Sequence, residues 1–347
     1  MKNYPALPGA LLALTAAFLF GASTPLVQRM GVGVGAWMTA ALLYCGAALA
    51  GWLLRSTSSK EAPVQKRHWP RLLMMSLFGA VLGPVALAWG LQHTGGMGAS
   101  LMLTLEAVFT VLLSVILYRE EIGRRVALAI AIMTAGGVLL VIDQADTGTS
   151  QVMGLLAVMA ATLAWGIDNS LSRGLADLDP GQVILGKAAL GAGVSFMIAV
   201  LLGQTSLTLY HGIGLLLIGA IGYGLSLRFY LLAQRSFGAS RTGSMFAAAP
   251  FIGAAIAFAL GERQFTFWLI GAALLMTAGV LLHLAEEHEH PHAHEALEHE
   301  HAHTHDDGHH DHAHATMPAG QHSHAHRHTS TQHSHPHAPD QHHGHKH

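Results

Sequence analysis

The chain has 347 residues, of which 51% are hydrophobic and only 11% are charged. Soluble globular domains carry about 25% charged residues, so the composition excludes an ordinary soluble protein and predicts a polytopic membrane protein whose main partner is the lipid bilayer. The single cysteine, Cys45, excludes disulfides within the chain and disfavours a cysteine-based metal site. The formal net charge of -2 says little, because the 27 histidines gain charge below about pH 6.5.

Ten apolar segments follow one another, each about long enough to cross a bilayer as a helix. They cover 8–29, 34–54, 71–91, 97–118, 123–142, 152–172, 181–203, 211–233, 241–261 and 265–284. Only helices and closed barrels satisfy their own backbone in lipid, and these segments lack the alternation of barrel strands, so we expect an all-α fold. The first segment resembles a signal peptide, but it continues past Gly21 and further spans follow, so we expect no cleavage.

The segments form two sets of five whose sequences resemble each other in a fixed order, which indicates a duplication. Matching positions include Gly21 with Gly166, Gly79 with Gly219, Glu120 with Glu262, and MTAG at 133–136 with MTAG at 276–279. An odd number of spans per set inverts the second set relative to the first, an arrangement common in transporters. We expect five-helix repeats at 9–142 and 152–284, followed by a tail at 285–347.

Lysine and arginine in the short loops predict the orientation, because cytoplasmic loops are enriched in them. With the N-terminus in the cytoplasm, the outside loops carry only Arg29 and Arg263. The inside loops then carry Lys2, Arg55, Lys60, Lys66, Arg67, Arg71, Arg119, Arg124, Arg125, Arg173, Arg235 and Arg241. We therefore expect a multi-pass protein of the cell (inner) membrane with both termini in the cytoplasm.

The fourth segment contains one ionisable side chain, Glu106, in the run LTLEAVFTVLL. A carboxylate at membrane depth is costly, and such residues often mark substrate or ion pathways. Glu106 is therefore either a cavity group that binds a cation or a proton, or a protonated or hydrogen-bonded group that holds helix packing.

Three further charged residues, Asp168, Lys187 and Arg228, lie toward the cytoplasmic side of the sixth, seventh and eighth segments. Buried charges in membranes tend to pair, so these residues are cavity candidates. A structural ion pair, or snorkelling of the two basic side chains to the headgroups, is the favoured interpretation. Trp89 and Trp165 are aromatic candidates for the same cavity, although packing is the commoner role.

Three prolines, Pro25, Pro84 and Pro250, lie within predicted spans. Proline removes a helix hydrogen bond and can bend or break the helix. We expect these positions to bend their helices, although proline is frequent in membrane helices generally.

The tail from Glu286 is rich in histidine, with 23 of the 27 histidines, and has almost no large apolar residues, so we expect it to be disordered. Imidazole suits Zn, Ni, Co and Cu, and alternate spacing on a flexible chain lets several rings converge on one ion. The candidate ligands are His288, His290, His292, His294, His299, His301, His303, His305, His309, His310, His312, His314, His322, His324, His326 and His328. An inert polar tail is the alternative.

Together, the two five-helix halves resemble EamA-type transporters of the drug/metabolite transporter superfamily over about residues 9–284. The similarity lies in LEAVF around Glu106, the helix ends at 118–120 and 261–262, and the closings MTAGGVLLV and MTAGVLLHL. The resemblance implies ten helices, inverted repeats, a central cavity, and transport of small metabolites without ATP. The family often has proline after the glutamate of the first half, where this chain has Ala107, whereas Pro250 keeps it in the second half.

Two functions stay open from the sequence. The first is a secondary transporter, an exporter of small metabolites or amino acids, with a metal-binding tail. The second is a divalent transition-metal permease whose tail collects or senses the cargo; a membrane metal sensor is a third, disfavoured by the full duplicated core. The chain has no GxxxxGK[ST] motif, so ATP drive is not expected. We expect no enzymatic activity, no required cofactor and no nucleic-acid partner, and a homodimer is left open.

Overall fold

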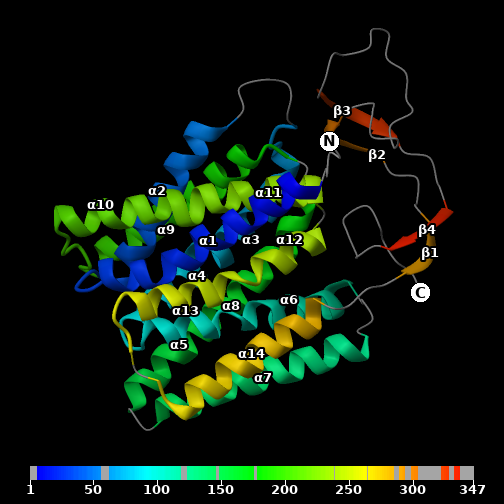
Figure 1. The fold of residues 1–347 in the computed structure, drawn as a ribbon. Helices are drawn as coiled ribbons and strands as arrows, with labels where there is room; N and C mark the ends of the chain where they lie inside the picture. The colour runs from blue at the N-terminus through cyan, green and yellow to red at the C-terminus, as the bar shows by residue number, and fades with distance from the viewer. Residues whose placement is uncertain are drawn as a thin grey trace.

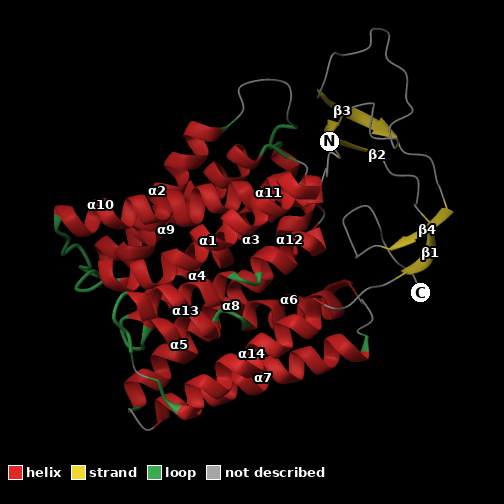
Figure 2. Ribbon diagram, viewed as in Figure 1, coloured by secondary structure: helices red, strands yellow, loops and turns green. Residues whose placement is uncertain are grey.

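The structure is a computed structural model that describes residues 6–55, 62–118, 123–145, 148–175, 178–237, 239–263 and 265–284. It also describes four short stretches of the tail, at 289–293, 298–303, 322–327 and 332–336. Up to residue 284 these residues form a bundle of helices (Figures 1 and 2). The all-α prediction for the membrane part is therefore confirmed.

The first repeat consists of five spans, two of which are interrupted helices. Its elements are α1 (Ala6–Met30), α2 (Ala36–Leu54), the short 3-10 helix η1 (Lys66–His68), α3 (Trp69–Met75), the π-helix η2 (Ser76–Leu82), α4 (Gly83–Leu91), α5 (Gly96–Met102), α6 (Leu105–Tyr118) and α7 (Arg124–Ala145). The third span thus runs through α3, η2 and α4, and the fourth runs through α5 and α6.

The second repeat has the same plan. Its elements are α8 (Thr149–Ser172), the 3-10 helix η3 (Arg173–Leu175), α9 (Pro180–Leu201), α10 (Leu209–Ile218), the π-helix η4 (Gly219–Leu225), α11 (Ser226–Phe237), α12 (Ala239–Phe246), α13 (Ala249–Ala259) and α14 (Phe267–Leu284). In each repeat the third span contains a π-helix and the fourth is broken near its middle, so the duplication seen in the sequence is also a duplication of helix irregularities.

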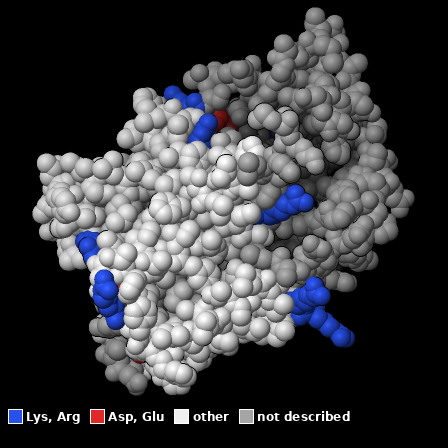
Figure 3. Space-filling view, in the orientation of Figure 1, with Lys and Arg blue, Asp and Glu red and all other residues white. Residues whose placement is uncertain are grey.

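The number of spans agrees with the prediction of about ten. Among the described residues, nine helices are long and apolar enough to cross a membrane, and a shorter apolar helix covers Phe267–His283. On the face drawn in Figure 3, lysine and arginine lie toward the edges and the middle is almost free of described charge. Such a surface suits lipid, in which charged side chains are costly.

The prolines divide into two groups. Pro84 stands in the first turn of α4, directly after η2, and Pro250 stands in the first turn of α13, after the break between α12 and α13. The first turn is where a missing N–H costs least. Pro25 lies inside α1, which continues unbroken to Met30. Two of the three predicted bending positions therefore coincide with helix irregularities.

Small residues let the central helices approach closely. A Cβ added to Gly219 of η4 would lie 1.9 Å from the carbonyl oxygen of Leu43 on α2, and one added to Gly21 of α1 would lie 2.3 Å from that of Ala249. Small residues at contacts are typical of membrane helices, whose association depends on packing. At the sides of the bundle, α2 packs on α9 and α7 on α14, so both lateral pairs join the two repeats (Figure 1).

The described stretches of the tail form four short strands, β1 (Glu289–Ala293), β2 (Glu298–His303), β3 (His322–Arg327) and β4 (Gln332–Pro336). The strands pair antiparallel as β1 with β4 and β2 with β3. This differs from the expected tail without regular structure. Histidine alternates with other residues there, a period of two that also suits a strand.

A topology prediction follows from the fold. The α1 helix begins, and the α14 helix ends, at the same end of the bundle (Figure 1). An even number of spans requires this arrangement. We expect reporter fusions after Arg55 and after Leu284 both to read as cytoplasmic. An outside signal from either fusion would contradict the ten-span inverted arrangement.

Candidate functional site

A small cavity of ≈ 80 Å³ lies at the centre of the bundle. Helices of both repeats line it, because α1, α2 and α6 face α8, α9, η4, α11 and α12 across it. The lining residues are Phe20, Tyr44, Glu106, Trp165, Asp168, Asn169, Lys187, Gly222, Tyr223, Ser226, Leu227, Tyr230 and Phe246. We call this space the central cavity; it has room for a few water-sized groups.

One side of the central cavity contains a buried ion pair. The Lys187 Nζ on α9 donates a hydrogen bond to the Asp168 Oδ2 on α8, and the side chains are only 6% and 7% exposed. The Asp168 Oδ1 is buried and has no hydrogen-bond partner among the described residues. A buried charge is tolerated when it is paired with an opposite charge, and removal of one partner leaves the other buried and unpaired.

The second carboxylate of the cavity, Glu106, lies across from this pair. Its Oε1 accepts a hydrogen bond of 2.6 Å from the Asn169 Nδ2 on α8. Glu106 stands in the first turn of α6, just after the break at Leu103–Thr104. The α8 helix therefore presents two neighbouring residues to the cavity: Asp168 pairs with Lys187, and Asn169 reaches Glu106.

Aromatic rings close the remaining wall. Phe20 meets Trp165 and Tyr223 edge-on, with ring centroids 5.7 Å apart in both pairs, and lies 5.4 Å from Phe246. Tyr44 contacts Tyr223 at 5.6 Å. Aromatic side chains combine a large apolar surface with some polar edges, so this wall suits a ligand that is partly apolar.

The π-helix η2 brings its backbone to the ion pair. The carbonyl oxygen of Gly79 accepts hydrogen bonds from the Tyr44 hydroxyl and, at 3.1 Å, from the Trp165 Nε1. A Cβ at Gly79 would lie 2.3 Å from the Asp168 carboxyl group. Only glycine allows this approach, which gives a physical reason for glycine at this position in the span.

We therefore expect Gly79→Ala to disturb the site. The added methyl group must displace the Asp168 carboxylate, and overpacking typically costs about 1–3 kcal/mol. The measurement is the melting temperature of the purified protein. Gly193→Ala is the matched control, because a Cβ there meets nothing within 4 Å and alanine favours a helix by up to about 1 kcal/mol. A Gly79→Ala protein as stable as the Gly193→Ala protein would contradict the packing described here.

The structure brings four of the predicted cavity residues together: Glu106, Asp168, Lys187 and Trp165. It does not bring in Trp89, which is 39% exposed and stacks on His93 with ring centroids 4.1 Å apart. Arg228 is half-buried on α11, and its guanidinium donates a hydrogen bond of 2.8 Å to the carbonyl oxygen of Leu54. It therefore links α11 to the end of α2.

Sequence reasoning did not single out several lining residues. Asn169 directly follows Asp168, and its value as a partner for Glu106 depends on which helix packs against α6. Tyr44 and Tyr223 lie in apolar spans where tyrosine is also a common packing residue. Its position next to a buried acid is the one signal in the sequence that could have pointed to Asn169.

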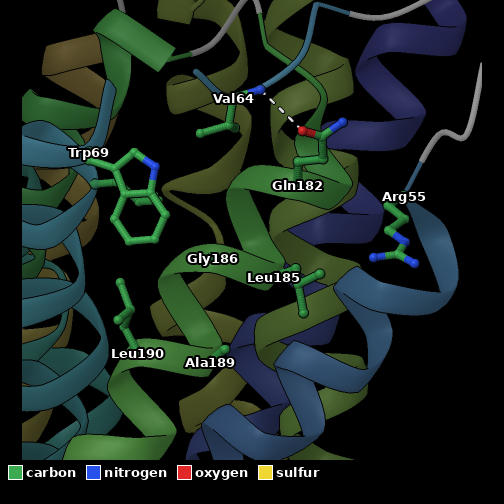
Figure 4. A pocket seen from close by; sticks show the side chains of 9 residues that line it. Arg55, Val64, Trp69, Gln182, Leu185, Gly186, Ala189 and Leu190 are labelled. Carbon is green, nitrogen blue, oxygen red and sulfur yellow. Dashed lines mark hydrogen bonds between the residues drawn. The ribbon is translucent and has the colours of Figure 1, made fainter. Parts of the chain in front are cut away.

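A second, larger hollow of ≈ 770 Å³ lies where α3 and α9 approach the end of the bundle at which α1 begins and α14 ends. Figure 4 shows Trp69, Arg55 and Gln182 around it, with Leu185, Gly186, Ala189 and Leu190 along α9. Gln182 accepts a hydrogen bond of 3.1 Å from the backbone N–H of Val64. Its wall is mainly apolar and contains neither buried acid of the central cavity.

Half of the predicted metal ligands of the tail lie outside the described residues. Of the sixteen histidines, His288, His294, His305, His309, His310, His312, His314 and His328 fall outside the described residues. The other eight lie in the strands, of which the backbone course is described. Within the described part of the chain, no group of three or more His, Cys, Asp or Glu side chains could hold a metal ion.

Fold and cavity together define a class: a multi-pass membrane transporter built from two inverted five-helix repeats. The model of the EamA-like transporter family matches residues 7–142 and 152–285, and the chain belongs to this family. It is thus a membrane transporter of small substrates.

The relatives agree with this assignment. An "Uncharacterized transporter" of Methanothermobacter thermautotrophicus (strain Delta H) is 27% identical over 293 residues, which cover 79% of this chain and 85% of the relative. A crystal structure described only as that of a protein matches with a TM-score of 0.59 at 19% identity, over 80% of this chain and 97% of the other. At that identity the match supports the fold alone.

Proposed function

We propose that the protein is a secondary transporter that exports small metabolites with an amino group, such as amino acids, through the central cavity. The observation that carries the proposal is the pairing of opposite charges beside an aromatic wall. Glu106 offers a carboxylate to a cationic group, and Lys187 offers an ammonium to an anionic group. The rings around Phe20 offer apolar surface to the rest of the solute.

Binding and release of such a solute need only an exchange of partners. A substrate carboxylate would compete with Asp168 for Lys187, and a substrate ammonium would compete with Asn169 for Glu106. In a cavity shielded from water, polar interactions are strong when every charged group has a partner. A charged group left without a partner there costs free energy. The site therefore favours solutes that satisfy both groups at once.

The alternative, a path for bare divalent metal ions, is less well supported by the cavity. Its two carboxylates are already engaged, Asp168 by an ammonium group and Glu106 by an amide. Transition-metal ions prefer sites with several His, Cys, Asp or Glu ligands. The lysine beside Asp168 would also repel a cation.

Ligand-dependent stabilisation of the purified protein tests this proposal. A ligand at a hundred times its dissociation constant stabilises the folded state by about 2.7 kcal/mol. We expect the melting temperature to rise with some members of a panel of standard amino acids and short amines. The same members should fail to stabilise Lys187→Gln or Glu106→Gln. Stabilisation by Ni²⁺ or Zn²⁺ alone, in a protein truncated after Leu284, would support the metal permease instead.

We further propose that the histidine-rich tail binds divalent metal ions such as Zn²⁺, Ni²⁺, Co²⁺ or Cu²⁺ without taking part in translocation. Deletion of 286–347 should remove most metal binding and leave transport in metal-free buffer intact. Neutral imidazole binds metal and protonation competes, so binding should be present above about pH 6.5 and fade below it. Isothermal titration with Zn²⁺ at pH 7.5 and pH 5.5 measures this. Loss of all transport on truncation would show that the tail belongs to the transport machinery.

A further inference from the structure

The end of the bundle opposite the start of α1 and the end of α14 is held together by contacts between the two repeats. We call it the distal end; it includes the loops at 31–35, 92–95 and 260–263. There the Glu262 carboxylate, after α13 of the second repeat, accepts hydrogen bonds from the backbone N–H groups of Gly96 and Met97 at the start of α5. Both distances are 2.8 Å, and each oxygen takes one donor.

A second contact crosses the same boundary. The Arg29 guanidinium at the end of α1 donates a hydrogen bond to the carbonyl oxygen of Leu260, which follows α13. We call these two contacts the distal latch. Gln28 supports the latch within the first repeat. Its Nε2 donates a hydrogen bond of 3.0 Å to the carbonyl oxygen of Thr94, just before α5.

Glycine makes the latch possible. A Cβ at Gly96 would lie 2.4 Å from the Gln28 Oε1 and 2.9 Å from the Glu262 Oε1. The polar groups thus approach the α5 backbone more closely than any side chain would allow. Hydrogen bonds from backbone N–H groups to a carboxylate are about twice as strong as neutral ones.

The latch holds the start of the span that leads from the distal end to the central cavity. From Gly96, α5 leads to the break at Leu103–Thr104 and then to Glu106 in the central cavity. Below the latch, α5 meets α13 closely, because a Cβ at Gly253 would lie 2.8 Å from the Ser100 Oγ. An opening of the distal end that separates α13 from α1 and α5 would break both latch contacts.

We infer that Glu262, with Arg29, is the gating residue that closes the distal end of the transport path between the two repeats. The inference rests on the proposed transport function for its meaning, but its geometry needs no substrate. In the state described here the latch is closed. Transport requires it to open and close, because a path open at both ends would abolish coupled transport.

Accessibility of a reporter cysteine at Ser100 tests the inference. In a Cys45→Ala background, Ser100→Cys places the only thiol beneath the latch, at a position that is fully buried. A membrane-impermeant maleimide added from the distal side should label it slowly. Addition of Glu262→Ala, which removes two charge-assisted hydrogen bonds, should accelerate labelling about tenfold or more.

Asp143→Ala is the matched control, because it also removes a carboxylate that accepts a hydrogen bond. Asp143 is also a carboxylate at the distal end, and it also joins the repeats, because the Thr266 hydroxyl donates to it between α7 and α14. That contact lies at the side of the bundle, so its loss should leave labelling of the Ser100→Cys thiol unchanged. Equal acceleration by Asp143→Ala would show general loosening and overturn the gating role.

Glu262→Gln serves where the alanine variant does not fold. It keeps the side-chain length and one acceptor oxygen, so we expect an intermediate labelling rate. Labelling at the background rate in the folded Glu262 variants would overturn the inference. The readout involves no cargo, so failure of the gate and failure of the proposed transport activity are distinguishable.

Discussion

Glu106→Gln should abolish transport, or slow it by about a hundredfold, while membrane yield stays near normal. The amide keeps the size of the side chain and can still hydrogen-bond Asn169, whose Nδ2 lies 2.6 Å from the Glu106 Oε1. It loses the charge that would bind the cationic group of a substrate, and a charged hydrogen bond within a dry site contributes about 1.5–3 kcal/mol. The measurement is the initial rate of solute flux in proteoliposomes.

A variant away from the cavity controls for this prediction. Asp143→Asn makes the same change from carboxylate to amide at the side of the bundle, between α7 and α14, and Asp143 does not line the central cavity. The flux of this control should stay near that of the wild-type protein, whereas Glu106→Gln should stay inactive. Full activity of Glu106→Gln would eliminate Glu106 as a substrate-binding group.

The second large effect concerns the Asp168–Lys187 pair. Lys187→Met should destabilise the protein by about 3–5 kcal/mol, because it leaves the Asp168 carboxylate buried without its partner. The double variant Asp168→Asn, Lys187→Met should regain much of the stability, since it removes both charges. Thermal unfolding in detergent compares the three proteins.

Transport separates a structural pair from a functional one. If the pair only holds α8 to α9, the stable double variant should transport normally. We expect instead that it stays inactive, because Lys187 is the cationic group that the central cavity offers to an anionic substrate. Normal flux through the double variant would assign the pair to packing, the interpretation that the sequence alone favours.

Composition and the lengths of the apolar segments were sufficient to predict the spans and the duplication, and they singled out Glu106, which the structure places in the lining of the central cavity. Apolar length decides whether a segment crosses a membrane, and a solitary carboxylate stands out against such a background. The helix breaks were partly readable, because Pro84 and Pro250 each begin a helix after an irregular stretch.

Contacts between helices were not readable in the same way. Trp89 and Trp165 have similar surroundings in the sequence, yet only Trp165 faces the central cavity, because the rotation of each helix depends on its neighbours. The same limit concealed the partnership of Asn169 with Glu106. Glu262 was noticeable as a helix-end residue, but the start of α5 that it caps lies 166 residues earlier.

Exchange of solutes across a proteoliposome membrane tests the central claim most directly, which is that small organic solutes pass through the central cavity. Vesicles loaded with unlabelled amino acids and short amines should take up the labelled solute that raised the melting temperature. We predict saturable uptake by the wild-type protein and by the protein truncated after Leu284, and none by Glu106→Gln. Uptake of Ni²⁺ or Zn²⁺ with no organic solute exchanged, or equal uptake by Glu106→Gln, would contradict the account.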